Sequence, residues 1–335
     1  MMMTKNKQSW IKLAAVLMPV LFSIPLVLGF FGAAHPALDS FSHFRMHLAV
    51  LMALSALPAL FLRLWREGIM AIVLSMTALA TVLTPPTAPG AEAAPTSLAQ
   101  YKLLQLNLRY DNEQQAEVFR LIGRESPDVI ALQEVSDNWR PRLKAIEARY
   151  PYTFYCSNRS SIGGAAILSR RPFALGSTPI CIDSLVAIAR IDFGGRSAII
   201  ASLHLDWPWP FAQDWNVEEI RPYFEKLEGP LIVSGDFNAV PWSQTLKNIT
   251  QYSKTHIAEG LRPSWLVNGT LVRAAKWIGL PLDHILVSDR IVSTQVETLE
   301  PVGSDHLPLL LRFSIAGVDD GNEPEQQTVM LEKSE

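Results

Sequence analysis

GPLIVSGDFN, residues 229–238, is an apolar run that ends in polar side chains. The run is short and apolar and follows a Gly-Pro turn signal, which is typical of a buried strand. Asp236 stands at the end of this strand, and Asn238 lies two residues further on. Burying a carboxylate without a partner is costly, so the pattern predicts that the strand ends at a solvated cleft.

Similar apolar runs recur throughout residues 101–315. Their lengths and flanking turn signals predict further strands at 102–108, 127–135, 164–169, 185–193, 196–205, 282–288 and 307–313. Helical spacing predicts helices at 112–125, with Asn112 as the N-cap, and at 213–227. This mixture predicts an α/β body in which helices cover layered sheets.

Most of these strands carry a polar group at or beside one end. The groups are Asn107, Glu134, His204, Asp206, Asp283, His284, Asp305 and His306. Separate burial of so many polar groups is implausible, so we expect most of them to meet at one sheet edge. Carboxylate and amide oxygens suit Mg²⁺, and histidines exchange protons near neutral pH. This inventory predicts metal-assisted hydrolysis of a phosphate ester, whereas the sequence has no GxSxG motif for acyl transfer by serine.

Six segments in register carry a family resemblance: LLQLNLR, ALQEV, SLHLDWPW, SGDFNAVPWS, LDHILVS and GSDHLPLLL. Residues 101–314 thereby resemble the endonuclease/exonuclease/phosphatase superfamily, and most of all its membrane-anchored bacterial members. The resemblance implies the DNase I-like fold. That fold is a four-layered α/β sandwich, with two packed β-sheets flanked by helices.

The resemblance also implies a metal site for Mg²⁺ or Mn²⁺. Glu134 is the expected main ligand, Asn107 lies beside it, and Asp305 adds a contact through water. Some relatives have an aspartate two residues after the first-strand asparagine, where this chain has Arg109. A second metal is therefore not expected at that corner.

The catalytic roles implied by the resemblance fall on five residues. Asp236 aligns or deprotonates the attacking water, and Asn238 contacts the phosphate or steadies that water. His306 binds the scissile phosphate and is oriented by Asp283. His204 stabilises the developing charge or serves the leaving group.

Residues 1–84 differ from the rest of the chain and predict a membrane anchor. Residues 13–34 are 22 residues without a charge, and two further apolar runs occupy 48–62 and 68–84. We expect three transmembrane helices, although the two shorter runs could instead form a hairpin pair within the membrane. A cleaved signal peptide that ends near residues 32–34 is the other alternative.

The positive charges predict an orientation for this anchor. Lys5, Lys7 and Lys12 precede the first run, and Arg63 and Arg66 separate the second from the third. The positive-inside rule places both groups in the cytoplasm. Three spans then put the catalytic domain on the periplasmic or extracellular side of a multi-pass inner-membrane protein.

The remaining boundaries follow from composition and charge. Residues 85–100 are a Pro/Ala-rich linker, 101–315 the catalytic domain, and 316–335 an acidic tail that we expect to be disordered. Residues 97–315 carry 22 basic and 23 acidic side chains. Such a balance argues against non-specific binding to long nucleic acid.

Four features outside the predicted site also led to expectations. Cys156 and Cys181 are expected to be reduced and buried, with a disulfide as the alternative in an oxidising compartment. His284 alternates with Asp283 on its strand and should face away from the site. The histidines of the first loop, His35, His43 and His47, are expected to be interfacial. The aromatic stretch 204–215 is either a packing staple or a rim beside the cleft that stacks on substrate or enters the bilayer interface.

The sequence as a whole predicts a Mg²⁺-dependent hydrolase of a phosphodiester or phosphomonoester at the outer face of the membrane. Its substrate could be a lipid head group, a small phosphoester or a nucleic acid, and nothing calls for an obligate protein partner. A periplasmic or extracellular nuclease for DNA or RNA is the alternative, and a non-catalytic membrane scaffold is the third hypothesis.

Overall fold

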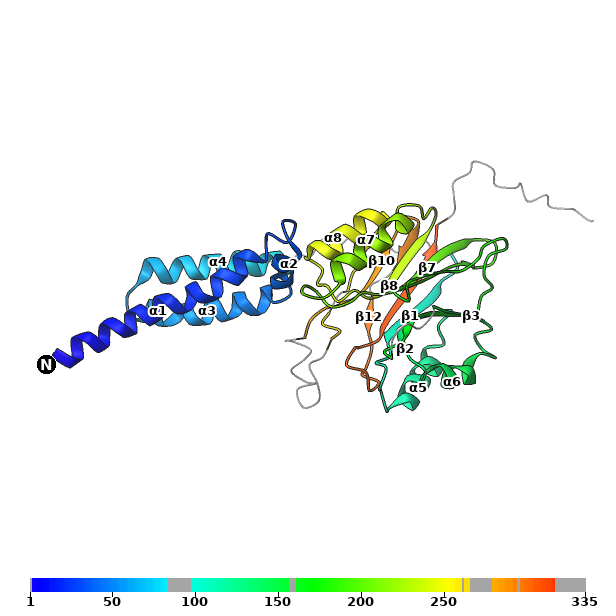
Figure 1. Ribbon diagram of the computed structural model, residues 1–335, viewed down its shortest axis with the longest axis horizontal. Helices are drawn as coiled ribbons and strands as arrows, with labels where there is room; N and C mark the ends of the chain where they lie inside the picture. Colours follow the sequence, from blue (N-terminus) through cyan, green and yellow to red (C-terminus); the bar gives the residue numbers. More distant parts are fainter. Residues whose placement is uncertain are drawn as a thin grey trace, which may run out of the picture.

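The structure is a computed structural model of the 335-residue chain, in which a bundle of helices leads into a body of two sheets (Figure 1). It describes residues 2–83, 98–156, 161–260, 262–265, 279–293 and 296–316. Most of the expected linker, 85–97, and nearly all of the expected tail, 317–335, lie outside the described residues.

The first sheet has the strand order β11-β13-β1-β2-β4-β3, and β12 pairs with β13. Its strands are β1 (Tyr101–Asn107), β2 (Val129–Val135), β3 (Tyr152–Tyr155), β4 (Gly164–Ser169), β11 (Ile291–Ser293), β12 (Glu297–Thr298) and β13 (Leu309–Ile315). β2 runs parallel to β1, and β13 runs antiparallel to it. The C-terminal ends of β1 and β2 therefore lie at the same edge as the start of β13.

The second sheet repeats this arrangement in the order β5-β6-β7-β8-β10-β9. Its strands are β5 (Ile180–Ile182), β6 (Val186–Asp192), β7 (Ser197–His204), β8 (Leu231–Asp236), β9 (His256–Ile257) and β10 (Asp283–Val287). β7 and β8 are parallel, and β10 is antiparallel to β8. The ends of β7 and β8 thus meet the start of β10.

Alternating side chains along the strands build three hydrophobic layers, because successive residues point to opposite faces. Leu103 packs between the sheets with Ile200 and Ile232, whereas Leu104 packs against the helices outside the first sheet. The helices outside the first sheet are α5 (Gln115–Glu125) and α6 (Arg140–Leu143), and α6 is followed by the 3₁₀ turn η1 (Lys144–Ile146). The second sheet is covered by α7 (Gln213–Phe224) and α8 (Gln244–Ser253). The predicted four-layered sandwich is confirmed.

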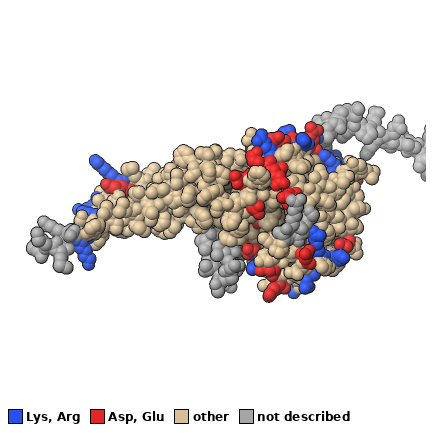
Figure 2. All heavy atoms as spheres, in the orientation of Figure 1, with Lys and Arg blue, Asp and Glu red and all other residues tan. Residues whose placement is uncertain are grey.

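The N-terminal helices are α1 (Met2–Leu28), α2 (Pro36–Ser42), α3 (Arg45–Phe61) and α4 (Trp65–Leu83). Lys7–Leu28 and Trp65–Leu83 are long and apolar enough to cross a membrane, and α2 with α3 makes a third candidate if this pair, bent by 62°, is one span. On the face shown in Figure 2, Lys and Arg gather at the end of the bundle remote from the body, and its middle is uncharged.

The other end of the bundle is hydrogen-bonded to the body through α2. The Asp39 carboxylate accepts hydrogen bonds from the amides of Gln244 and Thr245, at 2.8 and 3.0 Å. These amides open α8, where a negative charge complements the helix dipole. The indole of Trp242 donates to the carbonyl of Ser42 at 2.7 Å. α2 therefore completes the cap of a helix that lies 205 residues further along the chain.

Two sequence-based expectations are corrected by the structure. Asn112 is not the N-cap of α5, which begins at Gln115; its Oδ1 accepts the Gln114 amide in a turn instead. Cys156 and Cys181 are not two reduced thiols but form a disulfide, with their Cα atoms 5.0 Å apart. Cys156 directly follows β3 and Cys181 lies in β5. These are edge strands of different sheets, so only the stacking of the sheets brings the two cysteines together.

Candidate active site

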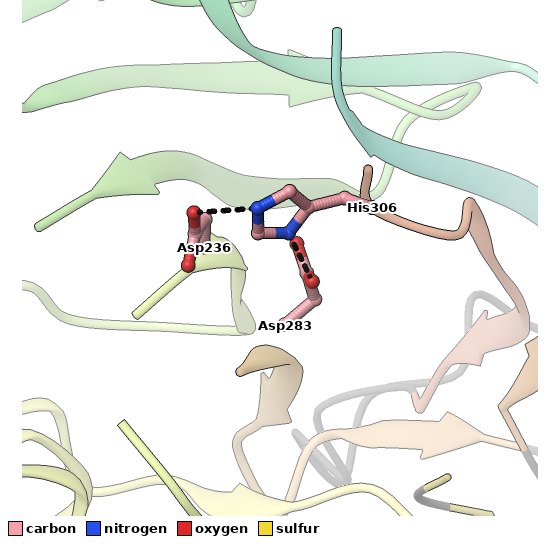
Figure 3. A group of neighbouring side chains, drawn as sticks. All are labelled: Asp236, Asp283 and His306. Carbon is pink, nitrogen blue, oxygen red and sulfur yellow. Dashed lines mark hydrogen bonds and ion pairs between the residues drawn. The ribbon is translucent and has the colours of Figure 1, made fainter. Parts of the chain in front are cut away.

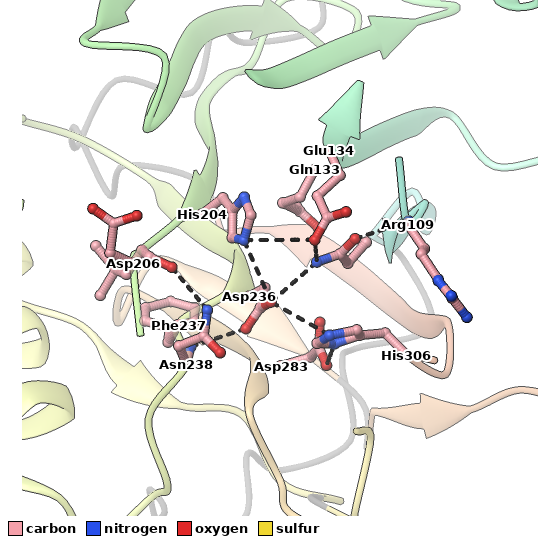
Figure 4. A network of polar contacts seen from close by, with 12 residues as sticks. Arg109, Gln133, Glu134, His204, Asp206, Asp236, Phe237, Asn238, Asp283 and His306 are labelled. Carbon is pink, nitrogen blue, oxygen red and sulfur yellow. Dashed lines mark hydrogen bonds and ion pairs between the residues drawn. The ribbon is translucent and has the colours of Figure 1, made fainter. Parts of the chain in front are cut away.

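Polar side chains from both sheets meet at one edge of the sandwich (Figure 4). They are Asn107, Glu134, His204, Asp236, Asn238, Asp283 and His306. The parallel strands contribute their C-terminal ends, and the antiparallel β10 and β13 contribute residues at or before their starts. The fold thus gathers seven of the eight predicted site residues in one network, and Asp305 lies next to it in the chain.

Two carboxylates share one amide donor at the centre of this network. Asn107 Nδ2 donates to Glu134 Oε1 and to Asp236 Oδ2, at 3.0 Å each. Glu134 Oε2 accepts the Tyr110 amide at 2.8 Å, and Asn107 Oδ1 accepts the Arg109 amide at 2.9 Å. Two mostly buried carboxylates beside a single neutral amide favour a cation, and their hard oxygens suit Mg²⁺ or Mn²⁺. The donor set therefore fits the metal that the sequence predicts.

The backbone at this centre is held in an unusual conformation. Glu134 has φ of +55° and lies where the pairing of β2 with β4 shifts register, and Asn238 has φ of +46°. Non-glycine residues in this left-handed region are uncommon and cluster at functional sites. Gly235 allows close approach of β7, because a Cβ there would lie 1.9 Å from the carbonyl oxygen of Leu203.

His306 and Asp283 form a buried ion pair (Figure 3). Nδ1 of His306 lies 2.7 Å from Asp283 Oδ2, and its Nε2 lies 3.5 Å from Asp236 Oδ2. Burial alone lowers the pKa of His306, but the charges of Asp283 and Asp236 outweigh it and raise this pKa to about 10. The imidazole is therefore cationic at neutral pH and suited to bind a phosphate oxygen.

Asp236, Asp283 and His306 lie close enough together to hold an ion, with one ligand atom from each within 4.8 Å of the others. The contacts of Asp283 argue against this set as the metal site. Its Oδ2 is engaged by His306, and its Oδ1 accepts from the side-chain amide of Gln105 at 2.9 Å. An ion bound here would displace both donors, so Asp283 is better suited to orient His306, as the sequence predicts.

His204 lies between the two central carboxylates and solvent. Its Nε2 is 3.9 Å from Glu134 Oε1 and 3.6 Å from Asp236 Oδ2, and 19% of its side chain is exposed. These are ion-pair distances rather than hydrogen bonds. His204 is thus near the carboxylates but still has access to an incoming molecule.

Asn238 donates two hydrogen bonds that fix its position, and its side-chain oxygen has no partner in the described part of the chain. Its amide donates to Asp236 Oδ1 at 2.9 Å, and its Nδ2 donates to the carbonyl of Leu205 at 2.8 Å. Its own Oδ1 is buried and has no hydrogen-bond partner among the described residues. A buried acceptor of this kind requires a donor, which an attacking water can supply.

Arg109 and Asp305 lie at the rim of the network. Arg109 pairs with Asp111 at 2.7 Å. The hydrogen bond from Arg109 to Asp111 raises the pKa of Arg109, and the charge of the half-buried Asp305 adds a smaller contribution. Asp206, to which we assign no chemistry, binds Asn216 through its backbone amide.

A layer of polar residues beneath the site was missed by the sequence analysis. Gln105 donates to Gln133 Oε1 at 2.9 Å as well as to Asp283, and Gln133 donates to Ser202 Oγ at 2.9 Å. Gln105 and Ser202 each lie two positions before a site residue on the same strand, so alternation along the strands could have revealed these two. Gln133 directly precedes Glu134, where alternation predicts the opposite face and the pairing of β2 with β4 shifts register.

His43 was expected to be interfacial, but the structure buries it against the site. Its Nε2 donates to the carbonyl of Asn238 at 3.0 Å, and the same carbonyl accepts from Gln213 Nε2 at 2.6 Å. His284 faces away from the network, as its alternation with Asp283 predicts, and binds the carbonyl of Ala239 at 2.7 Å. No local signal in the sequence distinguishes His43 from its neighbours.

Residues 104–306 match the Endonuclease/Exonuclease/phosphatase family. The match spans more than half of the 335 residues and contains the whole network, so the chain belongs to this family. The family name joins nucleases with phosphatases, both of which hydrolyse phosphate esters. No curated protein sequence matches the chain at a significant level.

Solved structures support the same fold. An endonuclease/exonuclease/phosphatase from Bacteroides vulgatus superimposes on this chain with a TM-score of 0.52 and 19% sequence identity. The superposition covers 65% of this chain and 99% of the Bacteroides vulgatus chain. A humanized D. rerio TDP2 has a TM-score of 0.50 and 19% identity, covering 64% and 99%. D. rerio TDP2 complexed with single strand DNA product has a TM-score of 0.51 and 17% identity, again covering 64% and 99%. These likenesses concern the fold alone.

Proposed function

We propose that this chain is a phosphoesterase dependent on Mg²⁺ or Mn²⁺ that hydrolyses a phosphodiester or phosphomonoester at the outer face of a membrane. One observation carries the proposal: the carboxylates of Glu134 and Asp236 converge on a single amide beside the buried His306–Asp283 ion pair. Such a centre offers oxygens for a cation and an imidazolium for a phosphate within one network.

Glu134 would hold the cation, with Asn107 beside it and Asp305 contributing through a water. When bound, the cation would neutralise charge on the phosphate oxygens. For Asn107 to act as a direct ligand its amide must turn, because its Oδ1 now accepts the Arg109 amide.

The other side chains divide the remaining work. His306 binds a phosphate oxygen and is kept cationic by Asp283. Asp236 accepts a proton from the attacking water, and burial raises its pKa, which strengthens it as a base. The unpartnered Oδ1 of Asn238 steadies that water. His204, at the exposed side, stabilises the developing charge or serves the leaving group.

We further propose that residues 1–84 form a membrane anchor with three spans and that residues 101–315 form a catalytic domain outside the cytoplasm. The disulfide between Cys156 and Cys181 supports a location outside the cytoplasm, because disulfides persist in oxidising compartments. The basic residues gather at the bundle end remote from the body, which the positive-inside rule assigns to the cytoplasm (Figure 2). Together these features favour a multi-pass inner-membrane protein whose active site faces the periplasm or the exterior.

The test is a substrate panel on the full chain purified in detergent. Phospholipids, inositol phosphates, cyclic nucleotides and single- and double-stranded DNA are each assayed with EDTA, and then with Mg²⁺ or Mn²⁺ restored. We expect hydrolysis of a phosphate ester that EDTA abolishes and the cation restores. Preferential cleavage of DNA would favour the alternative of a nuclease, and inactivity towards every ester would favour a scaffold.

A further inference from the structure

The segment between β7 and α7, residues 205–212, and the first turn of α7 expose four large aromatic side chains. We call residues 207–215 the aromatic loop. The exposed fractions are 44% for Trp207, 51% for Trp209, 63% for Phe211 and 73% for Trp215. Four large aromatic side chains exposed within nine residues are unusual on a surface that faces water alone, and tryptophan is enriched where proteins meet the membrane–water interface.

The aromatic loop lies at the end of the helical bundle. Ser40 Oγ, in α2, donates to the carbonyl of Trp209 at 3.1 Å. α2 lies between α1 and α3 and sits where the bundle meets the body (Figure 1). The loop is therefore level with the end of the apolar helices, where a bilayer surface would lie.

The catalytic edge lies at this same end of the body. Val82, in the last turn of α4, packs with Val240 and Trp242, which follow the site residue Asn238. The rings of Trp207 and Trp265 are 5.6 Å apart, and Trp265 pairs through its backbone with His306. The aromatic loop is thus linked to His306 by the ring contact between Trp207 and Trp265 and the backbone pairing between Trp265 and His306.

We propose that the substrate is a phosphate ester carried by a membrane lipid, and that the aromatic loop contacts the bilayer to bring the site to the head groups. This inference rests on the proposed function and names its substrate class. A phosphate on a lipid lies in the head-group layer beside the hydrocarbon core. The loop and the site both lie beside the body-facing end of the apolar helices, where that layer would be if these helices span the bilayer as proposed. The balanced charge of residues 97–315 supports a lipid over a long polyanion.

Contact with the bilayer is tested on the full chain in nanodiscs. Both cysteines are in the disulfide, so Phe211→Cys provides a single thiol for an environment-sensitive fluorophore. Tyr223→Cys, exposed near the other end of α7, is the matched control. We expect a spin label at head-group depth to quench the probe at 211 and not the one at 223. Equal quenching at both positions, or none at 211, would overturn the membrane contact and leave a protein partner as the occupant of the surface.

The substrate class is tested with nanodiscs that contain phosphatidic acid, phosphatidylglycerol and phosphatidylethanolamine, and with bis(4-nitrophenyl) phosphate in solution. The variant Trp209→Ser/Phe211→Ser/Trp215→Ser should lower hydrolysis of the lipid esters about tenfold or more, because apolar contact with the bilayer is lost. Its hydrolysis of the soluble diester should change less than about twofold, since the catalytic network is intact. Tyr223→Ser should change neither rate.

The outcomes separate this inference from the proposed function. Hydrolysis of the soluble diester alone, or equal loss on both substrates in the triple variant, would overturn the lipid assignment while the phosphoesterase stands. Failure of the wild-type chain to hydrolyse any ester with Mg²⁺ or Mn²⁺ would overturn both.

Discussion

The two ends of the space between the sheets are built from the same strands but from opposite chemistry. Along β1 the inward positions are Leu103, Gln105 and Asn107, and along β8 they are Ile232, Ser234 and Asp236. At one end aliphatic side chains exclude water. At the other end the polar side chains hydrogen-bond one another, although Gln105 Oε1, Ser234 Oγ and Asn238 Oδ1 have no partner among the described residues. The comparison teaches that one alternating pattern carries stability at one end of a strand and chemistry at the other. Substitutions at the two ends should therefore have different consequences.

The largest effect is expected at the polar end, from Glu134→Gln. The substitution removes a charge but keeps the shape, so it should weaken the cation site and lower kcat/KM about 10³-fold, or about 4 kcal/mol of activation free energy. Steady-state kinetics on the best ester, with a Mg²⁺ titration, measures it. Glu117→Gln, on the exposed face of α5, is the control. Wild-type activity in the Glu134 variant would exclude this residue as the main ligand.

At the apolar end, Ile232→Ala should act on stability instead. Ile232 is fully buried between the sheets, and such truncations cost about 3 kcal/mol in the free energy of unfolding. Denaturant titration followed by tryptophan fluorescence measures the loss, and Ile180→Ala, on an exposed position of β5, is the control. The turnover of the folded variant should match the wild type. A fall in kcat with unchanged stability would contradict the separation of the two ends.

A smaller, pH-dependent effect is expected at His284, which the apolar surroundings keep neutral. Burial lowers the pKa of His284 to about 4, from 6.5 in the unfolded chain. Above pH 6.5 both states are neutral, and between pH 6.5 and about 4 the unfolded state gains a proton that the folded state excludes. Stability is therefore lost as the pH falls through this window.

The measurement compares wild type with His284→Gln, which can still donate to the Ala239 carbonyl but does not titrate. Between pH 7.5 and 5 the wild type should lose about 2 kcal/mol more unfolding free energy than the variant. Parallel pH profiles would show that His284 does not contribute to acid sensitivity.

The smallest effect is expected where the bundle touches the polar end, at His43. His43→Ala removes one donor from the Asn238 carbonyl, and loss of such a hydrogen bond should lower kcat about tenfold with KM nearly constant. His43→Gln, which can donate from a similar place, should restore most of the rate. His256→Ala controls for the loss of a histidine elsewhere. An effect confined to thermal stability, with kcat unchanged, would show that His43 holds the bundle in place and does not position the site.

Much of the fold was predictable because a short apolar run bounded by turn signals is typical of a buried strand. The run 229–237 became β8 (Leu231–Asp236), and seven further predicted strands also formed. The short strands β3, β5, β9, β11 and β12 and the helices α2, α6 and α8 were missed. Strands of two to four residues carry too little periodicity to be recognised.

The sequence alone determined the order of the main strands, the family, and the residues that carry oxygens and imidazoles at the strand ends, because these depend on local pattern and side-chain chemistry. The tertiary structure decided the remainder: the left-handed backbone of Glu134, the Cys156–Cys181 disulfide, the polar layer around Gln105, and the contact of His43 with Asn238. Each of these depends on groups far apart in the chain, up to 195 residues for His43 and Asn238, or on the register between strands. Such contacts are set by how the sheets and the bundle pack, which no local stretch of sequence records.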